Sequence, residues 1–211
     1  LLCNHKVVER LMRELGLKAR VRPKRYVKFR ETGMINGQKN LLARVFSADQ
    51  PKQKWTTDIT EFRVCGQRVY LSAMMDLYNR EIISYRVSDR IGFDLVDQTL
   101  KQALSRLEPH VYPMIHSDQG WHYRMKPYVN QLLHRGLQQS MSGKGNCLDN
   151  AAMESCFAII KTEFFYGNTF KSVDSFKQEL DRYIRYYNHD RIKLKLAGMS
   201  PVDFRLAHAL I

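Results

Sequence analysis

Three acidic side chains occur in contexts where a carboxylate could do chemistry, although they are far apart along the chain. Asp58 lies within a run of β-favouring residues, Asp118 ends a short apolar run, and Glu154 lies near the start of a helical segment. A carboxylate in a core strand is costly unless it is paired or bound to a metal. Hard divalent cations such as Mg²⁺ take oxygen ligands of this kind. The combination predicts a site where two Mg²⁺ ions activate an attacking oxygen and stabilise a leaving one.

Each acid taken alone also has an ordinary structural explanation. Asp58 could face solvent from an edge strand, Asp118 could belong to a polar turn, and Glu154 could be an exposed helical acid. Two further acids fit structural roles better. Asp76 ends a strand before a turn, and Asp149 is typical of a helix N-cap.

Polar and basic side chains flank the predicted metal site. Lys161 follows Glu154 by seven residues, so both lie on one helix face and the lysine could contact a DNA phosphate. His116 precedes Asp118 by two residues and could contact DNA, or it could be a polar residue with satisfied hydrogen bonds. Lys144 lies between two glycines in a predicted loop and is a further candidate DNA contact.

The chain carries a strong positive charge, which favours a polyanionic partner. It has 34 Lys and Arg against 21 Asp and Glu, for a formal net charge of +13. The stretch 18–30 contains basic and aromatic residues and no acid, so it can release counterions from phosphates and stack on bases. A solvated linker would have a similar composition. The residues that we assign to DNA contact in this stretch are Arg20, Arg22, Lys24 and Arg25.

Composition also excludes several classes of protein. With 211 residues and 44% hydrophobic content, the chain can form one compact domain and a small extra piece. No window approaches the roughly eighteen apolar residues of a membrane helix, and no signal peptide is evident, so we expect a cytoplasmic protein. The cysteines have no paired spacing, which indicates reduced thiols and no zinc knuckle.

Hydrophobic periodicity predicts the elements that position these side chains. Three strands are expected first, at 54–62, 68–77 and 81–88, and shorter strands are expected within 112–120 and 137–142. Helices are expected at 93–107, 126–137, 150–165 and 172–187. This order predicts an α/β fold in which a mixed five-stranded sheet is flanked by helices.

The N-terminal part differs from the rest in composition and hydrophobic pattern. Residues 4–16 predict a short amphipathic helix that begins after Asn4 and ends at Gly16. We therefore divide the chain into a basic helical DNA-binding segment at 1–30, a linker at 31–53 and a catalytic core with C-terminal helices at 54–211.

Several motifs together resemble the DDE transposases of bacterial insertion sequences. More narrowly, they resemble the second-reading-frame protein of the group whose transposase is made by frameshifting, a group similar to the retroviral integrases. Thirty-five residues separate Asp118 from Glu154, which is the spacing of that group. The resemblance covers nearly the whole chain. The motifs are WTTDIT at 55–60, HSDQG at 116–120 with Tyr123, NCLDNAAMES at 146–155, Lys161, YYN at 186–188 with Arg191, and GMSP at 198–201.

This resemblance implies a ribonuclease H-like fold in which Asp58, Asp118 and Glu154 hold two Mg²⁺ or Mn²⁺ ions. It implies that water attacks at the ends of a mobile element and that the freed 3′ hydroxyls then attack another DNA phosphate. We expect a homo-multimer on DNA in the bacterial nucleoid, no membrane partner, and an upstream-frame helix-turn-helix protein as an additional partner. The alternatives are a catalytically inactive DNA-binding remnant and a simple nuclease of the same fold.

Overall fold

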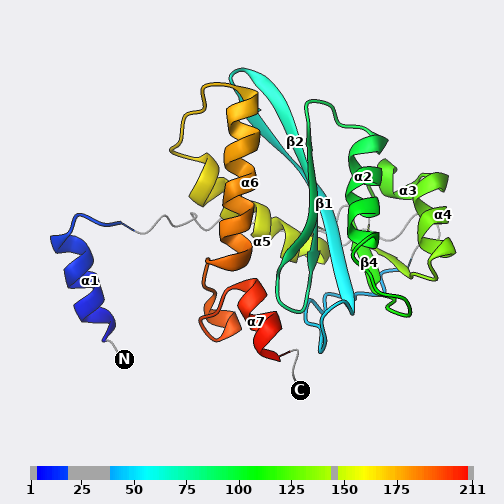
Figure 1. The fold of residues 1–211 in the computed structure, drawn as a ribbon, viewed down its shortest axis with the longest axis horizontal. Helices are drawn as coiled ribbons and strands as arrows, with labels where there is room; N and C mark the ends of the chain where they lie inside the picture. The colour runs from blue at the N-terminus through cyan, green and yellow to red at the C-terminus, as the bar shows by residue number, and fades with distance from the viewer. Residues whose placement is uncertain (1–3, 19–38, 144–146, 209–211) are drawn as a thin grey trace.

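The structure is a computed structural model that describes residues 4–18, 39–143 and 147–208. Its centre is a five-stranded sheet in the order β3-β2-β1-β4-β5 (Figure 1). The strands β1, β2 and β3 are antiparallel neighbours, whereas β4 and β5 run parallel to β1, so the predicted mixed sheet is confirmed. The strand bounds are β1 Lys54–Val64, β2 Gln67–Asp76, β3 Ile82–Ser88, β4 Met114–Ser117 and β5 Gln139–Met141.

The hairpin between β1 and β2 explains the long register of these two strands. Only Cys65 and Gly66 separate them, and both have positive φ angles, 48° and 77°. A two-residue turn with positive φ at both positions matches the twist of the strands that it joins. The ladder then runs from the pair of Val64 with Gln67 to the pair of Trp55 with Asp76.

Helices cover both faces of the sheet, as Figure 1 shows. Alternation along β2 divides the core, because Leu71, Ala73 and Met75 join one apolar cluster and Met74 joins the other. The first cluster lies under α5 and α6, and the second lies under α2 and α4. The helix bounds are α2 Phe93–Leu104, α3 Trp121–Arg124, α4 Lys126–His134, α5 Ala151–Ile160, α6 Val173–His189 and α7 Pro201–His208.

The helices differ from the predicted ones in a few places. The predicted helix at 150–165 is α5 followed by a π-helical turn at Lys161–Phe165, and a 3₁₀ turn at Cys147–Asn150 precedes it. The short α3 and the terminal α7 were not predicted. The N-terminal helix α1 (His5–Glu14) has the predicted cap, since the Asn4 side chain accepts a hydrogen bond from the Lys6 N–H. No helix within the described ranges is long and apolar enough to span a membrane.

Residues 39–42 precede the sheet and pack along its β5 edge. The N–H groups of Leu41 and Leu42 donate to the Ser140 hydroxyl at 2.9 and 3.0 Å. Leu42 is only 1% exposed and belongs to the cluster under α5 and α6. This segment lies inside the range that we assigned to a linker, and it covers an edge that would otherwise offer unpaired backbone groups.

Candidate active site

The register of two parallel strands brings Asp58 and Asp118 together. In the ladder between β1 and β4, Thr56 lies opposite His116. Asp58 and Asp118 follow these two residues by the same number of positions, so both carboxylates emerge at the same end of the strand pair. They line one cavity of about 250 Å³. Its other lining residues are Ile59, Glu61, Tyr70, Ile91, Gly120, His122 and Tyr123.

The Asp58 carboxyl is strongly perturbed. Burial and the negative charges of Asp118 and Glu154 together raise its pKa to about 7, against a lowering effect of the Ile59 N–H. That N–H donates to Asp58 Oδ1 at 2.7 Å. A carboxyl held among other acids in this way gains stability from a bound cation, which would favour its charged form.

The Asp118 carboxylate is held by the backbone that follows it. The Gly120 N–H donates to Asp118 Oδ1 at 2.9 Å. A Cβ atom at position 120 would lie 2.9 Å from that same oxygen and 3.3 and 3.4 Å from ring atoms of Tyr123 and His122. A side chain at position 120 would therefore press on this carboxylate, which glycine leaves in place.

Glu154 lies farther from the cavity than the other two acids. It is an exposed residue in the first turn of α5 and does not line the cavity, although its charge contributes to the raised pKa of Asp58. Among the described residues, no three His, Cys, Asp or Glu side chains are grouped closely enough to hold a metal ion. The structure thus brings two of the three predicted carboxylates into one cavity and leaves the third at longer range.

The start of α5 is tied to the strand that carries Asp58. The Thr56 hydroxyl donates to Asn150 Oδ1 at 2.7 Å, and Asn150 Nδ2 donates to the Thr57 carbonyl at 3.4 Å. Asn150 is 3% exposed and is the residue from which α5 begins. These two bonds hold α5, with Glu154 on its first turn, against the part of β1 that carries Asp58.

The prediction that Asp149 caps a helix was wrong. Its carboxylate is buried and forms an ion pair with Arg44, with Nε and Oδ1 2.8 Å apart. The other oxygen accepts hydrogen bonds from Asn40 Nδ2 and from the Gly143 N–H, both at 2.9 Å. The carboxylate therefore joins the segment before β1 to the two ends of the loop that leads into α5. A partner more than one hundred residues away in sequence outcompetes the local cap.

The prediction that His116 contacts DNA was also wrong, because its side chain is fully buried, with 0% exposed. Its Nδ1 lies 2.9 Å from the Ser140 hydroxyl and its Nε2 lies 3.1 Å from the Ser142 hydroxyl. The alternative expectation, a polar residue with satisfied hydrogen bonds, is the one that the structure confirms. Burial lowers the His116 pKa to about 4, against the opposing influence of Asp149.

The neighbours of His116 define its tautomer. The Ser140 oxygen already accepts two backbone N–H groups, so its own proton points to His116 Nδ1. The proton of the neutral imidazole is then on Nε2, which donates to Ser142. The Ser142 hydroxyl donates in turn to the Ser117 carbonyl, next to Asp118. We call this series of hydrogen bonds the serine–histidine chain.

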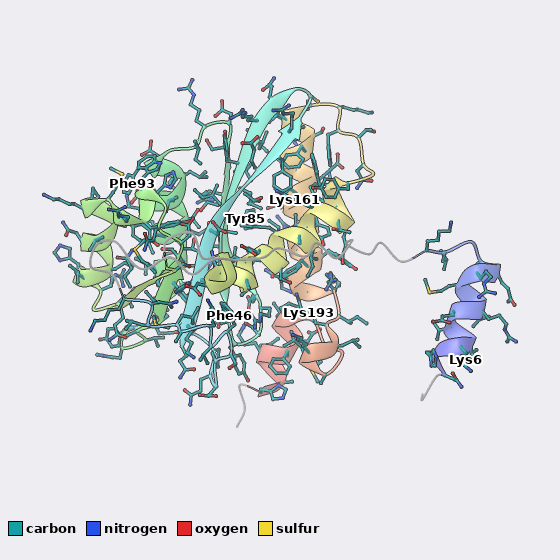
Figure 2. The ribbon with its side chains drawn as sticks, turned by 180° about the vertical axis from the view of Figure 1, so that it is seen from behind. Lys6, Phe46, Tyr85, Phe93, Lys161 and Lys193 are labelled. Atoms are coloured by element: carbon teal, nitrogen blue, oxygen red, sulfur yellow. The ribbon has the colours of Figure 1, made fainter. Side chains whose placement is uncertain are left out.

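The other predicted DNA contacts have different outcomes. Lys161 is half-buried at the junction of α5 with the π-helical turn, beside β1 (Figure 2). Its Nζ lies 5.5 Å from the centre of the Phe62 ring, and burial lowers its pKa, against the opposing charge of Glu61. The remaining candidates fall outside the described residues. They are Lys144, Arg20, Arg22, Lys24 and Arg25.

Asp76 has the structural role that the sequence predicts. It is 2% exposed, and its carboxylate accepts hydrogen bonds from the Lys52 N–H at 2.6 Å, the Tyr78 N–H at 2.9 Å and Trp55 Nε1 at 3.2 Å. These bonds close the turn after β2 at the end of the sheet where β1 begins.

No sequence motif singles out His122, which lines the cavity beside the two aspartates. It is 6% exposed, and within the described ranges neither of its ring nitrogens has a hydrogen-bond partner. The neighbouring Trp121 stacks on it, with ring centres 4.1 Å apart. The only signal available beforehand was its position shortly after Asp118.

Two family models match the sequence, and both are described as an integrase core domain. One matches residues 48–147 and the other matches residues 154–208. A transposase of insertion sequence element IS150 from Escherichia coli K12 is 48% identical, over 96% of this chain and 71% of that protein. A transposase-like protein of Haemophilus influenzae is also 48% identical, over 96% of this chain and 93% of its own. The transposase for IS904 from Lactococcus lactis is 33% identical, over 97% and 81%.

Solved structures with a similar fold include viral integrase chains. One chain of the simian T-cell lymphotropic virus intasome, in complex with a PP2A regulatory subunit, has a TM-score of 0.65 at 17% identity. That alignment covers 83% of this chain and 59% of the viral one. The HTLV-2 integrase catalytic core domain in complex with magnesium has a TM-score of 0.59 at 14% identity, over 74% and 98%. These likenesses confirm the predicted ribonuclease H-like fold.

Proposed function

Because the chain belongs to the family of bacterial insertion-sequence transposases with an integrase core domain, we propose that it cuts DNA at the ends of a mobile element and joins the freed 3′ ends to a target. The observation that carries this proposal is the cavity beside the middle of β1 and the end of β4. There, Asp58 and Asp118 lie side by side, and the pKa of Asp58 is raised to about 7.

The residues of this cavity fit a divalent metal. Two carboxylates, with water and substrate phosphate, are a usual ligand set for Mg²⁺. We assign Asp58 and Asp118 as ligands of Mg²⁺ or Mn²⁺, with Glu154 as a third ligand and two ions in all. When bound, such ions supply activation of the attacking oxygen and stabilisation of the leaving oxygen. The structure neighbour solved with magnesium supports the choice of metal.

The protein's own groups prepare the site in three ways. The Gly120 N–H and the Ile59 N–H orient the two carboxylates. The ties from Asn150 to β1 keep the first turn of α5 next to the strand that carries Asp58. Lys161 has its ammonium group beside β1, and we assign it to contact a DNA phosphate.

The proposed arrangement of the whole chain follows the same logic. Residues 1–30 form a DNA-binding segment, in which the basic stretch 18–30 makes the contacts. Residues 54–211 form the catalytic core. Two DNA ends must react together, so we propose a homo-multimer on DNA, which agrees with the trimeric and dimeric forms of the HTLV-2 core. An upstream-frame helix-turn-helix protein is the proposed additional partner, and the bacterial nucleoid is the proposed setting.

The test of this proposal is the substitution Asp118→Asn. The amide keeps an oxygen for the Gly120 N–H but loses the charge, so cleavage and joining should fall about 10³-fold or more. DNA affinity, measured without metal, should stay nearly unchanged. Asp174→Asn is the matched control, because the Asp174 side chain is 87% exposed on α6. Full joining activity in Asp118→Asn would contradict the proposal, and cleavage without joined products in the unmodified protein would indicate a simple nuclease.

A further inference from the structure

Two arginines lie directly opposite each other near the tip of the β1–β2 hairpin. In the ladder, Arg63 is opposite Arg68, next to the closing pair of Val64 with Gln67. Both arginines are exposed. Directly opposite side chains lie on the same face of a sheet with their Cβ atoms about 5 Å apart, and like charges in such a pair are destabilising. The hairpin therefore holds two guanidinium groups where they repel each other, which favours an anionic partner.

A neighbouring acid neutralises only part of this charge. Glu61 Oε1 lies 3.7 Å from Arg68 Nε, and the two side chains are 42% and 61% exposed. An ion pair this exposed is screened by solvent and salt and contributes little. Among the described residues, no side chain forms a hydrogen bond or an ion pair with Arg63. Arg63 and Arg68, which we call the arginine pair, therefore keep an excess of positive charge.

The two faces of this part of the hairpin differ sharply. Phe62, Val64 and Val69 point to the other face, where they are buried in the cluster under α5 and α6. The arginine pair lies on the face that α2 covers farther along, at Met74. Figure 1 shows the tip of the hairpin away from α2. The apolar face thus anchors the ribbon, and the arginine pair is open to a large partner.

The arginine pair continues the surface that lines the catalytic cavity. Ile59 and Glu61 on β1 and Tyr70 on β2 line that cavity, and the arginine pair occupies the next positions on the same strand face. Arg63 follows Asp58 by five positions. A strand rises about 3.3 Å per residue, so the two positions are about 16 Å apart along β1. A duplex rises about 3.4 Å per base pair, so this length corresponds to about five base pairs.

One edge of β1 is without a strand partner over the same distance. Among the described strands, β4 pairs with β1 only at Lys54, Trp55 and Thr56. From the α5 side, Lys161 reaches this part of β1 and places its Nζ 5.5 Å from the centre of the Phe62 ring. A polyanion that leaves the cavity along this edge therefore meets basic side chains from both faces of the sheet.

We propose that the arginine pair binds backbone phosphates of duplex DNA about five base pairs from the reacting phosphodiester. The contact is made to phosphate oxygens, so it fixes the direction of the DNA along β1 and does not read its sequence. Bound phosphates also relieve the repulsion between the two guanidinium groups. This inference rests on the proposed function, because it assigns the contact to the DNA that reacts at Asp58 and Asp118.

The first test detects the contact in the unmodified protein. Arginines are labelled with phenylglyoxal, with and without a short DNA duplex and without metal, and the labelling of each arginine is measured by mass spectrometry. We expect the duplex to protect Arg63 and Arg68 and to leave Arg135 and Arg182 reactive. These two controls are exposed, after α4 and on α6. Equal labelling of the arginine pair with and without DNA, or equal protection of all four arginines, would overturn the proposal.

The second test measures how DNA affinity depends on salt. The double variant Arg63→Gln/Arg68→Gln loses two phosphate contacts, so its slope of log affinity against log salt should flatten by about 1 to 2, at about 0.9 for each contact. The double variant Arg135→Gln/Arg182→Gln has the same net charge and should keep the slope of the unmodified protein. If the two variants have equal slopes, the effect belongs to total charge and the proposed contact is wrong.

A single variant separates DNA binding from a role in folding. Arg63→Gln removes the repulsion across the ladder, so its thermal transition without DNA should stay the same or rise. Its affinity for the duplex should fall nonetheless. A lower thermal transition together with unchanged affinity would mean that Arg63 serves the hairpin itself, and the proposal would be wrong.

Failure of this inference and failure of the proposed function give different results. If the protein joins DNA but the duplex does not protect the arginine pair, the phosphate contact is wrong and the function stands. If the protein neither cuts nor joins DNA yet the arginine pair is protected, the contact exists and the proposed reaction is wrong.

Discussion

The two sides of the candidate active site are held by different kinds of structure. Asp58 lies in β1 and Asp118 directly follows β4, and the register of these two parallel strands is set by backbone hydrogen bonds. Glu154 belongs to α5, whose position depends on the side chains of Asn150 and Asp149. Backbone ladders tolerate most substitutions, whereas a helix tied by side chains does not. The positions of Asp58 and Asp118, the strand side, are therefore set once the sheet forms. The position of Glu154, the helix side, can be changed by substitutions in the side chains that hold α5.

The largest expected effect comes from breaking the strand side directly. Gly120→Ala places a Cβ atom 2.9 Å from Asp118 Oδ1, and the carboxylate must move to make room. Because a misplaced reacting group costs about 10²-fold, joining should fall by about that factor while the thermal transition changes little. Gly92→Ala is the control, since nothing lies within 4 Å of a Cβ at that position. Normal joining by Gly120→Ala would show that Asp118 need not keep its present position.

The next effect comes from releasing the helix side. Asp149→Ala leaves Asn40, Gly143 and the Arg44 guanidinium without their acceptor, so the free energy of unfolding should fall by about 2 kcal/mol. Joining should fall about 10-fold or more, because α5 is no longer fixed against the sheet. Urea unfolding and a joining assay at several magnesium concentrations measure both. A variant that is less stable but joins at the normal rate would break the proposed link between Asp149 and catalysis.

The third expected effect is on stability and not on activity. Asp58 and His116 should make the stability of the folded protein depend on pH in opposite directions. The folded-state pKa of Asp58 is about 7, above its ordinary 3.8, so without metal the folded protein loses stability as pH rises between these values. The folded-state pKa of His116 is about 4, below its ordinary 6.5, so its contribution to stability is lost as pH falls through that interval. Asp58→Asn should therefore raise the unfolding temperature near neutral pH in the presence of a chelator and change it little near pH 4. A rise of equal size at both pH values would argue against the raised pKa.

The smallest effect is expected at Arg44, the exposed partner in the ion pair with Asp149. Arg44 is paired with Asp149, but its side chain is 46% exposed, so solvent screens the charge. Arg44→Lys should lower the free energy of unfolding by about 1 kcal/mol or less. If urea unfolding showed that Arg44→Lys costs as much as Asp149→Ala, the distinction between a buried acceptor and an exposed donor would fail.

The strand side could be predicted from sequence because its signals are local. Alternating residues indicate the strands, and the placement of Asp58 and Asp118 in them predicts that the two carboxylates meet. The helix side could not be predicted in the same way. Asp149 pairs with Arg44, which lies in a polar stretch without periodicity, and nothing nearby in sequence marks the pair. The distance of Glu154 from the cavity is likewise a tertiary property.

The histidines show the same limit. His116 follows an apolar run, but only the fold shows that Ser140 and Ser142 occupy both of its nitrogens. His122 has no motif of its own, and its interest comes from the absence of a partner within the described ranges. Sequence patterns report which residues are present, whereas hydrogen-bond satisfaction depends on what the finished fold places beside them.

The serine–histidine chain connects the segment before the sheet to the residue that precedes Asp118. Its hydrogen bonds run from the backbone of Leu41 and Leu42 to the carbonyl of Ser117, one residue before Asp118. A force that draws this segment away from β5 would act on Ser140 first and on the end of β4 next. Tension on the residues before β1 would therefore reach the Asp118 end of β4 through polar contacts along one border of the sheet.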